Sequence, residues 1–194
     1  MSLFEIVLLG IALSADAFSV TVSNTFVYAH ESRRRLMLMP VFFGAFQALM
    51  PLLGYFLGGV AAAFIEKYAG IVTLVILGVI GGNMVREGVS ALRAAKSGET
   101  EAIEEVRAGQ HLTVGIVAFQ AVATAIDAFA VGVSLRAQAV NLIFSVSVIG
   151  LTTFACCVVA ILLGRRLGRL LGDRAEVVGG CVLIAIGLRA FFQL

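Results

Sequence analysis

Two acidic residues lie inside long apolar segments, and each is embedded in nearly the same short motif. Asp16 lies in the stretch GIALSADAFSVTVS, and Asp127 lies 111 positions later in ATAIDAFAVGVS. A carboxylate in the centre of a membrane-spanning helix costs about 2.5–3.5 kcal/mol on insertion scales, so such residues are usually functional. Two of them at equivalent positions of a repeat indicate one shared site rather than two accidents of packing.

Oxygen-bearing side chains in the apolar segments predict a site for a hard divalent cation such as Mn²⁺, Mg²⁺ or Ca²⁺. The candidate ligands are Asp16, Asp127, Gln47, Ser19, Thr124 and Asn24. Helical spacing places Ser19 on the stripe of Asp16 and Thr124 on the stripe of Asp127. Gln47 comes four residues before Pro51, whose missing N–H leaves the carbonyl of Gln47 without its helical partner. An ordinary proline kink explains that pair equally well.

Composition excludes several classes of function. The chain has 194 residues, of which 60% are hydrophobic and 13% charged, so we expect an integral membrane protein that contacts the lipid bilayer. The apolar segments contain no paired Cys or His that could form a zinc or copper(I) site, and the three Cys lack metal-ligand spacing. The chain contains no phosphate-loop motif, so we expect no nucleotide binding. It contains no basic patch with aromatic residues, so we expect no nucleic-acid binding. We therefore expect no cofactor, with the metal ion as a transported substrate.

Six apolar runs are long enough to cross a bilayer as helices. The expected helices are Leu3–Ala29, Leu36–Gly59, Tyr68–Val89, Thr113–Leu135, Val140–Gly164 and Ala175–Phe192. Most Lys and Arg residues fall in the first, third and fifth connections, including Arg33, Arg34 and Arg35 in the first. By the positive-inside rule those connections face the cytoplasm, which predicts that both termini lie outside.

The repeat extends beyond the two Asp motifs. LLGYFLG at 52–58 matches LLGRRLG at 162–168, and an Ile-Gly pair at 80–81 matches a pair at 186–187. A three-helix unit that follows itself in one chain inserts its second copy upside down, an architecture of secondary transporters with the substrate near the midplane. We expect an all-α fold of two inverted repeats, residues 1–95 and 113–194, joined by a polar cytoplasmic linker at 96–112.

Five segments carry a family resemblance: SADAF at 14–18, FGAFQALMPLLGYFLG at 43–58, GGNMVREG at 81–88, AIDAFAVGV at 125–133 and RAEVVGGCVLIAIG at 174–187. Together they resemble the MntP-type manganese efflux pumps of bacteria. The resemblance implies a six-helix exporter of the inner membrane that lowers cytoplasmic Mn²⁺, with Asp16 and Asp127 in the essential role. The chain departs from the family at Gln47, where some members have Glu, and at Asn83, where many have Lys or Arg.

The leading hypothesis is a proton-coupled secondary transporter that exports Mn²⁺, bound between Asp16 and Asp127. One alternative is an exporter of another small solute, either a different divalent cation or an amino acid, although no midplane Lys or Arg is visible for a substrate carboxylate. A second alternative is an intramembrane aspartyl protease, but those enzymes carry YD and GxGD motifs that this chain lacks.

Overall fold

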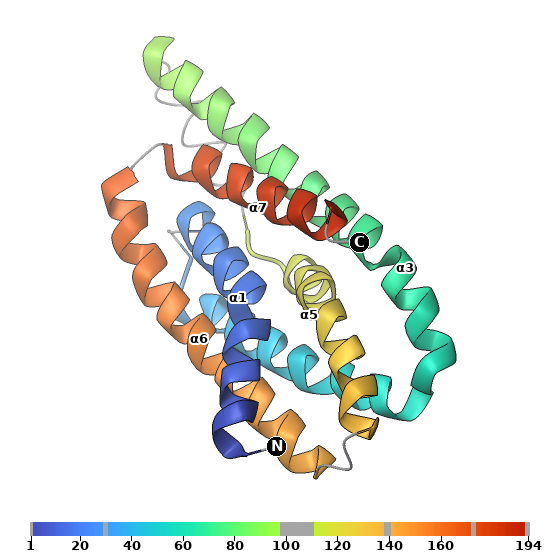
Figure 1. The fold of residues 1–194 in the computed structure, drawn as a ribbon. Coiled ribbons are helices and arrows are strands. Elements are labelled where there is room, and N and C mark those ends of the chain that lie inside the picture. Colours follow the sequence, from blue (N-terminus) through green and yellow to red (C-terminus); the bar gives the residue numbers. More distant parts are fainter. Residues whose placement is uncertain (1, 29–30, 98–110, 138–140, 172–173, 193–194) are drawn as a thin grey trace.

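The computed structural model describes residues 2–28, 31–97, 111–137, 141–171 and 174–192, and this part of the chain is entirely helical apart from turns and short connections (Figure 1). The helices are α1 (Leu3–Val27), α2 (Arg33–Leu36), α3 (Leu38–Ser97), α5 (Val114–Ala137), α6 (Leu142–Leu171) and α7 (Ala175–Phe192). A capping box starts α1, in which Ser2 Oγ accepts from the N–H of Glu5 and the Glu5 carboxylate accepts from the N–H of Ser2. Residues 98–110, most of the expected linker, lie outside the described residues.

The expected break between the second and third helices is wrong. Residues 38–97 form one continuous helix of 60 residues, which changes direction in its blue-green middle part (Figure 1). The intervening segment, VAAAFIEKYA at 60–69, is rich in good helix formers and contains no proline, so nothing in it stops the backbone helix. The apolar run ends in this segment, but the backbone helix continues through it. The sixth predicted helix, Ala175–Phe192, matches the bounds of α7.

The bundle is apolar outside and carries polar side chains inside, as expected of a membrane protein. Phe4, Phe56 and Leu151 are about 70% exposed, whereas Gln47 and Gln120 are fully buried. Five segments are long and apolar enough to cross a membrane: Leu3–Thr25, Arg33–Leu57, Gly70–Ser90, Val114–Arg136 and Leu142–Arg166. A shorter apolar stretch, Val177–Arg189, lies in α7. The chain is a multi-pass membrane protein.

The tightest approach of two helices is where the first part of α3 crosses α5. Gly54 of α3 lies directly against the carbonyl of Phe129, and Gly132 of α5 lies directly against the carbonyl of Pro51. A Cβ at either glycine would overlap these carbonyl groups, so only glycine allows the two backbones this close. In the other part of the bundle, α1 packs along α6, where Gly164 meets Thr25.

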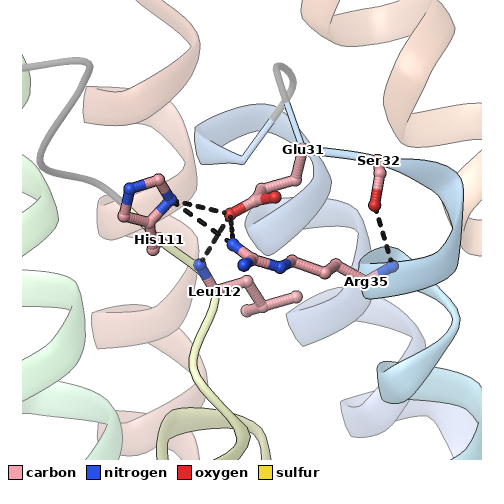
Figure 2. Close-up of polar contacts among 5 residues, drawn as sticks. All are labelled: Glu31, Ser32, Arg35, His111 and Leu112. Atoms are coloured by element: carbon pink, nitrogen blue, oxygen red, sulfur yellow. Dashed lines mark hydrogen bonds and ion pairs between the residues drawn. The ribbon is translucent and has the colours of Figure 1, made fainter.

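A cluster of polar contacts joins the first connection to the start of α5 (Figure 2). Glu31 Oε1 accepts from Arg35 at 2.9 Å, from the N–H of Leu112 at 3.3 Å, and lies 3.2 Å from His111 Nδ1. Loss of water around Glu31 raises its pKa, but the hydrogen bonds from Arg35, His111 and Leu112 outweigh this and leave the pKa lowered. The end of α1, the first connection and the start of α5 therefore lie at one end of the bundle, called the linker end below.

Candidate metal site

Asp16 and Asp127 lie on two antiparallel helices and face the same region of the bundle. Asn24 of α1 is hydrogen-bonded to Gln120 of α5, which fixes the register of the two helices. Asp16 lies eight residues before Asn24 in α1, and Asp127 lies seven residues after Gln120 in α5. Because the two helices are antiparallel, the same register brings the two carboxylates to one level. They interact electrostatically with each other. The register thus places the two predicted acids at one level of the neighbouring helices.

The two carboxylates have different neighbours. Asp127 is exposed, and its Oδ1 accepts a hydrogen bond of 2.8 Å from the N–H of Ala128 in its own helix. Asp16 is half-buried and interacts electrostatically with Arg189 of α7. The two repeat-related acids thus differ in burial and in their partners.

Gln47 contributes an oxygen without a partner beside α1. Its Nε2 donates to the carbonyl of Leu13 at 3.2 Å, and Leu13 lies three residues before Asp16. Its Oε1 is buried and has no hydrogen-bond partner. An orphaned buried acceptor costs roughly 1–3 kcal/mol, so its presence here calls for a ligand or a water. Gln47 therefore fits the role of a neutral oxygen ligand.

The smaller candidate ligands are placed unequally. Ser19 Oγ donates to the carbonyl of Ala15 at 2.9 Å, and Thr124 Oγ1 donates to the carbonyl of Gln120 at 3.0 Å. A hydroxyl that donates in this way still has lone pairs for a cation. Asn24, in contrast, lies about 12 Å along α1 from Asp16 at 1.5 Å per residue, and its amide is taken up by Gln120. The structure therefore does not bring Asn24 to the two carboxylates.

Sequence reasoning missed Arg189. It lies in the last turn of α7 and interacts electrostatically with Asp16. The repeat alignment held a signal, because the Ile-Gly match at 80–81 and 186–187 aligns Arg189 with Asn83, a position where the resemblance leads one to expect a cation.

The ligand chemistry is that of oxygen donors. Among the residues that the structure describes, no three His, Cys, Asp or Glu side chains lie close enough together to hold a metal ion. Two carboxylates therefore have to be completed by neutral oxygens such as Gln47 Oε1, by backbone carbonyls or by water. Such a set suits Mn²⁺, Mg²⁺ or Ca²⁺ rather than a thiolate-seeking metal.

Comparison with known proteins gives one consistent family. The family model described as "Putative manganese efflux pump" matches residues 29–191. Similar curated proteins, all named putative manganese efflux pump MntP or MntP 2, come from Ruminiclostridium cellulolyticum (40% identical over 193 residues, covering 100% of this chain and 97% of the relative), Clostridium botulinum strain Hall (36% over 195 residues, 100% and 96%) and Methanosphaera stadtmanae (33% over 187 residues, 96% and 97%). No solved structure matches the chain. The family is one of transporters and not of enzymes, and the chain belongs to this MntP family of manganese efflux pumps.

Proposed function

We propose that this protein exports Mn²⁺ from the cytoplasm across the inner membrane, with the ion held between Asp16 and Asp127. The observation that supports the proposal is that the Asn24–Gln120 register places the two repeat-related carboxylates at one level of α1 and α5, where they interact electrostatically. Two negative charges neutralise one divalent cation, and Gln47 Oε1 adds a neutral ligand from α3. The manganese itself is taken from the names of the relatives, because the ligand set alone does not distinguish Mn²⁺ from Mg²⁺.

An inverted repeat with a two-fold axis near these carboxylates is part of the proposal. Such an axis must bring some residues against their own counterparts in the other half. Asp16 interacts with Asp127, and a side chain on Gly44 would lie 3.1 Å from the Cβ of its counterpart Phe154, 110 positions later. These self-paired contacts support two halves that rock about a fixed midplane site.

The orientation follows from charge. The Arg-rich first connection and the start of α5 share the linker end, so a single end collects two of the connections predicted to face the cytoplasm. With that end inside, both termini are outside, and the ion enters from the linker end and leaves at the other. Protons that exchange on the same carboxylates are the simplest coupling ion, because protonation outside would release the metal.

The decisive experiment measures cellular manganese in an exporter-deficient bacterium that expresses the wild type, Asp16→Asn or Asp127→Asn. Each substitution keeps the shape and deletes the charge. We expect manganese export to fall at least about tenfold in either variant, since loss of even an outer-shell partner of a metal ligand costs about 10–100-fold in affinity.

The matched control is Glu5→Gln, which makes the same chemical change on the same helix but in the capping box at its start, a role that Gln also fills. It should retain export. Export by the Asn variants at the wild-type level would show that the carboxylate site is wrong, whereas a wild type that leaves manganese unchanged would show that the substrate is wrong.

One observation favours a second candidate, the amino-acid exporter. Arg189 interacts electrostatically with Asp16, so the cation of Arg189 could bind a substrate carboxylate and the anion of Asp16 its ammonium group. Uptake of labelled amino acids into inside-out vesicles, with and without Mn²⁺ as competitor, separates the two substrates.

A further inference from the structure

Asn24 and Gln120 form a closed amide pair between α1 and α5. Asn24 Nδ2 donates to Gln120 Oε1 at 2.6 Å, and Gln120 Nε2 donates back to Asn24 Oδ1 at 3.2 Å. Both side chains are fully buried, and Asn24 Nδ2 also lies 3.5 Å from the sulfur of Met39 on α3. Three helices are thus tied together at this point.

The pair lies between the two aspartates and the linker end. It is eight residues from Asp16 along α1 and seven from Asp127 along α5, which is about 10–12 Å in either helix. Both distances run toward the end where α1 finishes and α5 begins. An ion that moves between the linker end and the carboxylates along these two helices must pass the pair.

Burial changes along the same path. On the linker side of the carboxylates, α1 and α5 present a layer of fully or nearly fully buried polar side chains: Thr21, Ser23, Asn24, Thr25, Gln120 and Thr124. At the level of the carboxylates, Asp127 is exposed and Asp16 is half-buried. Within the layer, Ser23 Oγ has no hydrogen-bond partner, although a buried hydroxyl normally finds one. Buried polar side chains are therefore concentrated in α1 and α5 between the carboxylates and the linker end.

We propose that the Asn24–Gln120 pair is the inner gate of the transporter, closed in this structure on the linker side of the ion site. The inference rests on the proposed function for the direction of transport. An amide pair opens by exchanging two hydrogen bonds for contacts with water or with the passing cation, whose hydration shell the two amide oxygens then replace in part. A pair of apolar side chains would seal the same gap without offering that exchange.

The test measures how fast a membrane-impermeant thiol reagent labels Ser19→Cys, which lies beside the carboxylates, from the linker side of membrane vesicles. Labelling of the chain with only its native Cys156, Cys157 and Cys181 is subtracted. Thr113→Cys, exposed at the linker end, identifies the vesicles that present this end to the reagent. With the native pair we expect slow labelling of Ser19→Cys, and Asn24→Ala or Gln120→Ala should raise the rate about tenfold, as loss of a buried hydrogen-bonded pair predicts.

The swapped variant, Asn24→Gln with Gln120→Asn, keeps a reciprocal amide pair and should restore slow labelling. If the alanine variants do not fold, the apolar pair Asn24→Leu with Gln120→Met tests the same idea, because replacing both partners leaves no orphaned polar group. It should label as slowly as the native pair and yet lose export. Fast labelling with the native pair, or an apolar pair that still exports, would overturn the gate. Labelling does not depend on the substrate, so its result stands even if Mn²⁺ proves wrong.

Discussion

The two halves of the molecule carry the same Asp-Ala-Phe motif, but the last helical segment of each half packs differently against the motif helix of the other half. The last helix of the second half, α7, contacts α1 where Gly179 meets the carbonyl of Ser23, since a Cβ on Gly179 would lie 3.0 Å from that oxygen. The last segment of the first half, in α3, contacts α5 where Thr73 Oγ1 donates to the carbonyl of Ala123 at 3.2 Å. Thr73 and Gly179 are equivalent in the repeat alignment, but Ser23 and Ala123 are not.

This difference of register decides which carboxylate has a cation. Ten residues beyond Gly179, α7 brings Arg189 to the level of Asp16, and the two interact. Ten residues beyond Thr73, α3 brings Asn83 toward the linker end, whereas Asp127 lies four residues from Ala123 in the other direction. The separation along the axis is about 20 Å. The two repeated acids therefore differ in their electrostatic surroundings, because Asp16 interacts with Arg189 whereas the charge that acts on Asp127 is that of Asp16.

The largest expected effect concerns two equivalent glycines, Gly54 and Gly164, at two helix crossings between the halves. Gly54→Ala drives a methyl group into the carbonyl of Phe129, which cannot move without its helix, while Gly164→Ala meets the Thr25 side chain at 2.8 Å. We expect Gly54→Ala to lower the free energy of unfolding by about 3 kcal/mol or more, and Gly164→Ala by about 1 kcal/mol. Thermal unfolding in detergent measures both.

Gly82→Ala is the control, because a Cβ at Gly82 meets open space. It should be neutral or stabilising by about 0.4–1 kcal/mol. Equal losses for Gly54→Ala and Gly164→Ala would mean that the two crossings are equally close.

The same comparison of the two halves shows which features the sequence predicts and which it does not. Apolar runs bounded by charge place α1, α5 and α7 well, because burial in lipid demands both length and apolarity. They do not separate α3 into two helices, since a polar residue such as Lys67 marks the membrane surface without ending a helix. Side-chain periodicity identifies the faces of α1 and α5, and repetition identifies Asp16 and Asp127.

Side-chain periodicity specifies neither how far apart two residues lie along the helix axis nor the register at which two helices pack. Asn24 shares the polar character of Asp16 but lies two turns away, so it pairs with Gln120 and leaves the predicted ligand set. Arg189 interacts with Asp16 because of the register at which α7 packs on α1, which the sequence of α7 alone does not specify.

Changing the charge at the equivalent positions 189 and 83 tests the comparison of the two halves with an expected effect of intermediate size. Arg189→Gln removes the cation beside Asp16 and leaves two uncompensated acids, so Mn²⁺ should bind several-fold more tightly and be released more slowly. Asn83→Arg, the matched change in the other half, should alter affinity little, because Asn83 lies far from Asp127 along the bundle. Isothermal titration of purified protein with Mn²⁺ compares the two, and an equal effect of both variants would show that the halves have the same register.

The smallest expected effect lies where the halves are tied together, at Glu31, Arg35 and His111 (Figure 2). The hydrogen bonds to Glu31 lower its pKa below the ordinary value of 4.5, so the folded state gains stability from the ionised form. That contribution is fully present above about pH 4.5 and is lost as the pH falls through the lowered pKa of the folded state. Glu31→Gln removes it at every pH. Because the Arg35 and His111 side chains are exposed, the gap in stability between wild type and Glu31→Gln should be less than about 1 kcal/mol at pH 7 and should close at lower pH. Thermal unfolding of both proteins between about pH 7 and pH 3 measures the gap, with Glu5→Gln as the carboxylate control. A gap that stays open at the lowest pH would mean that Glu31 is not stabilised through its charge, and the tie between the halves would then not be ionic.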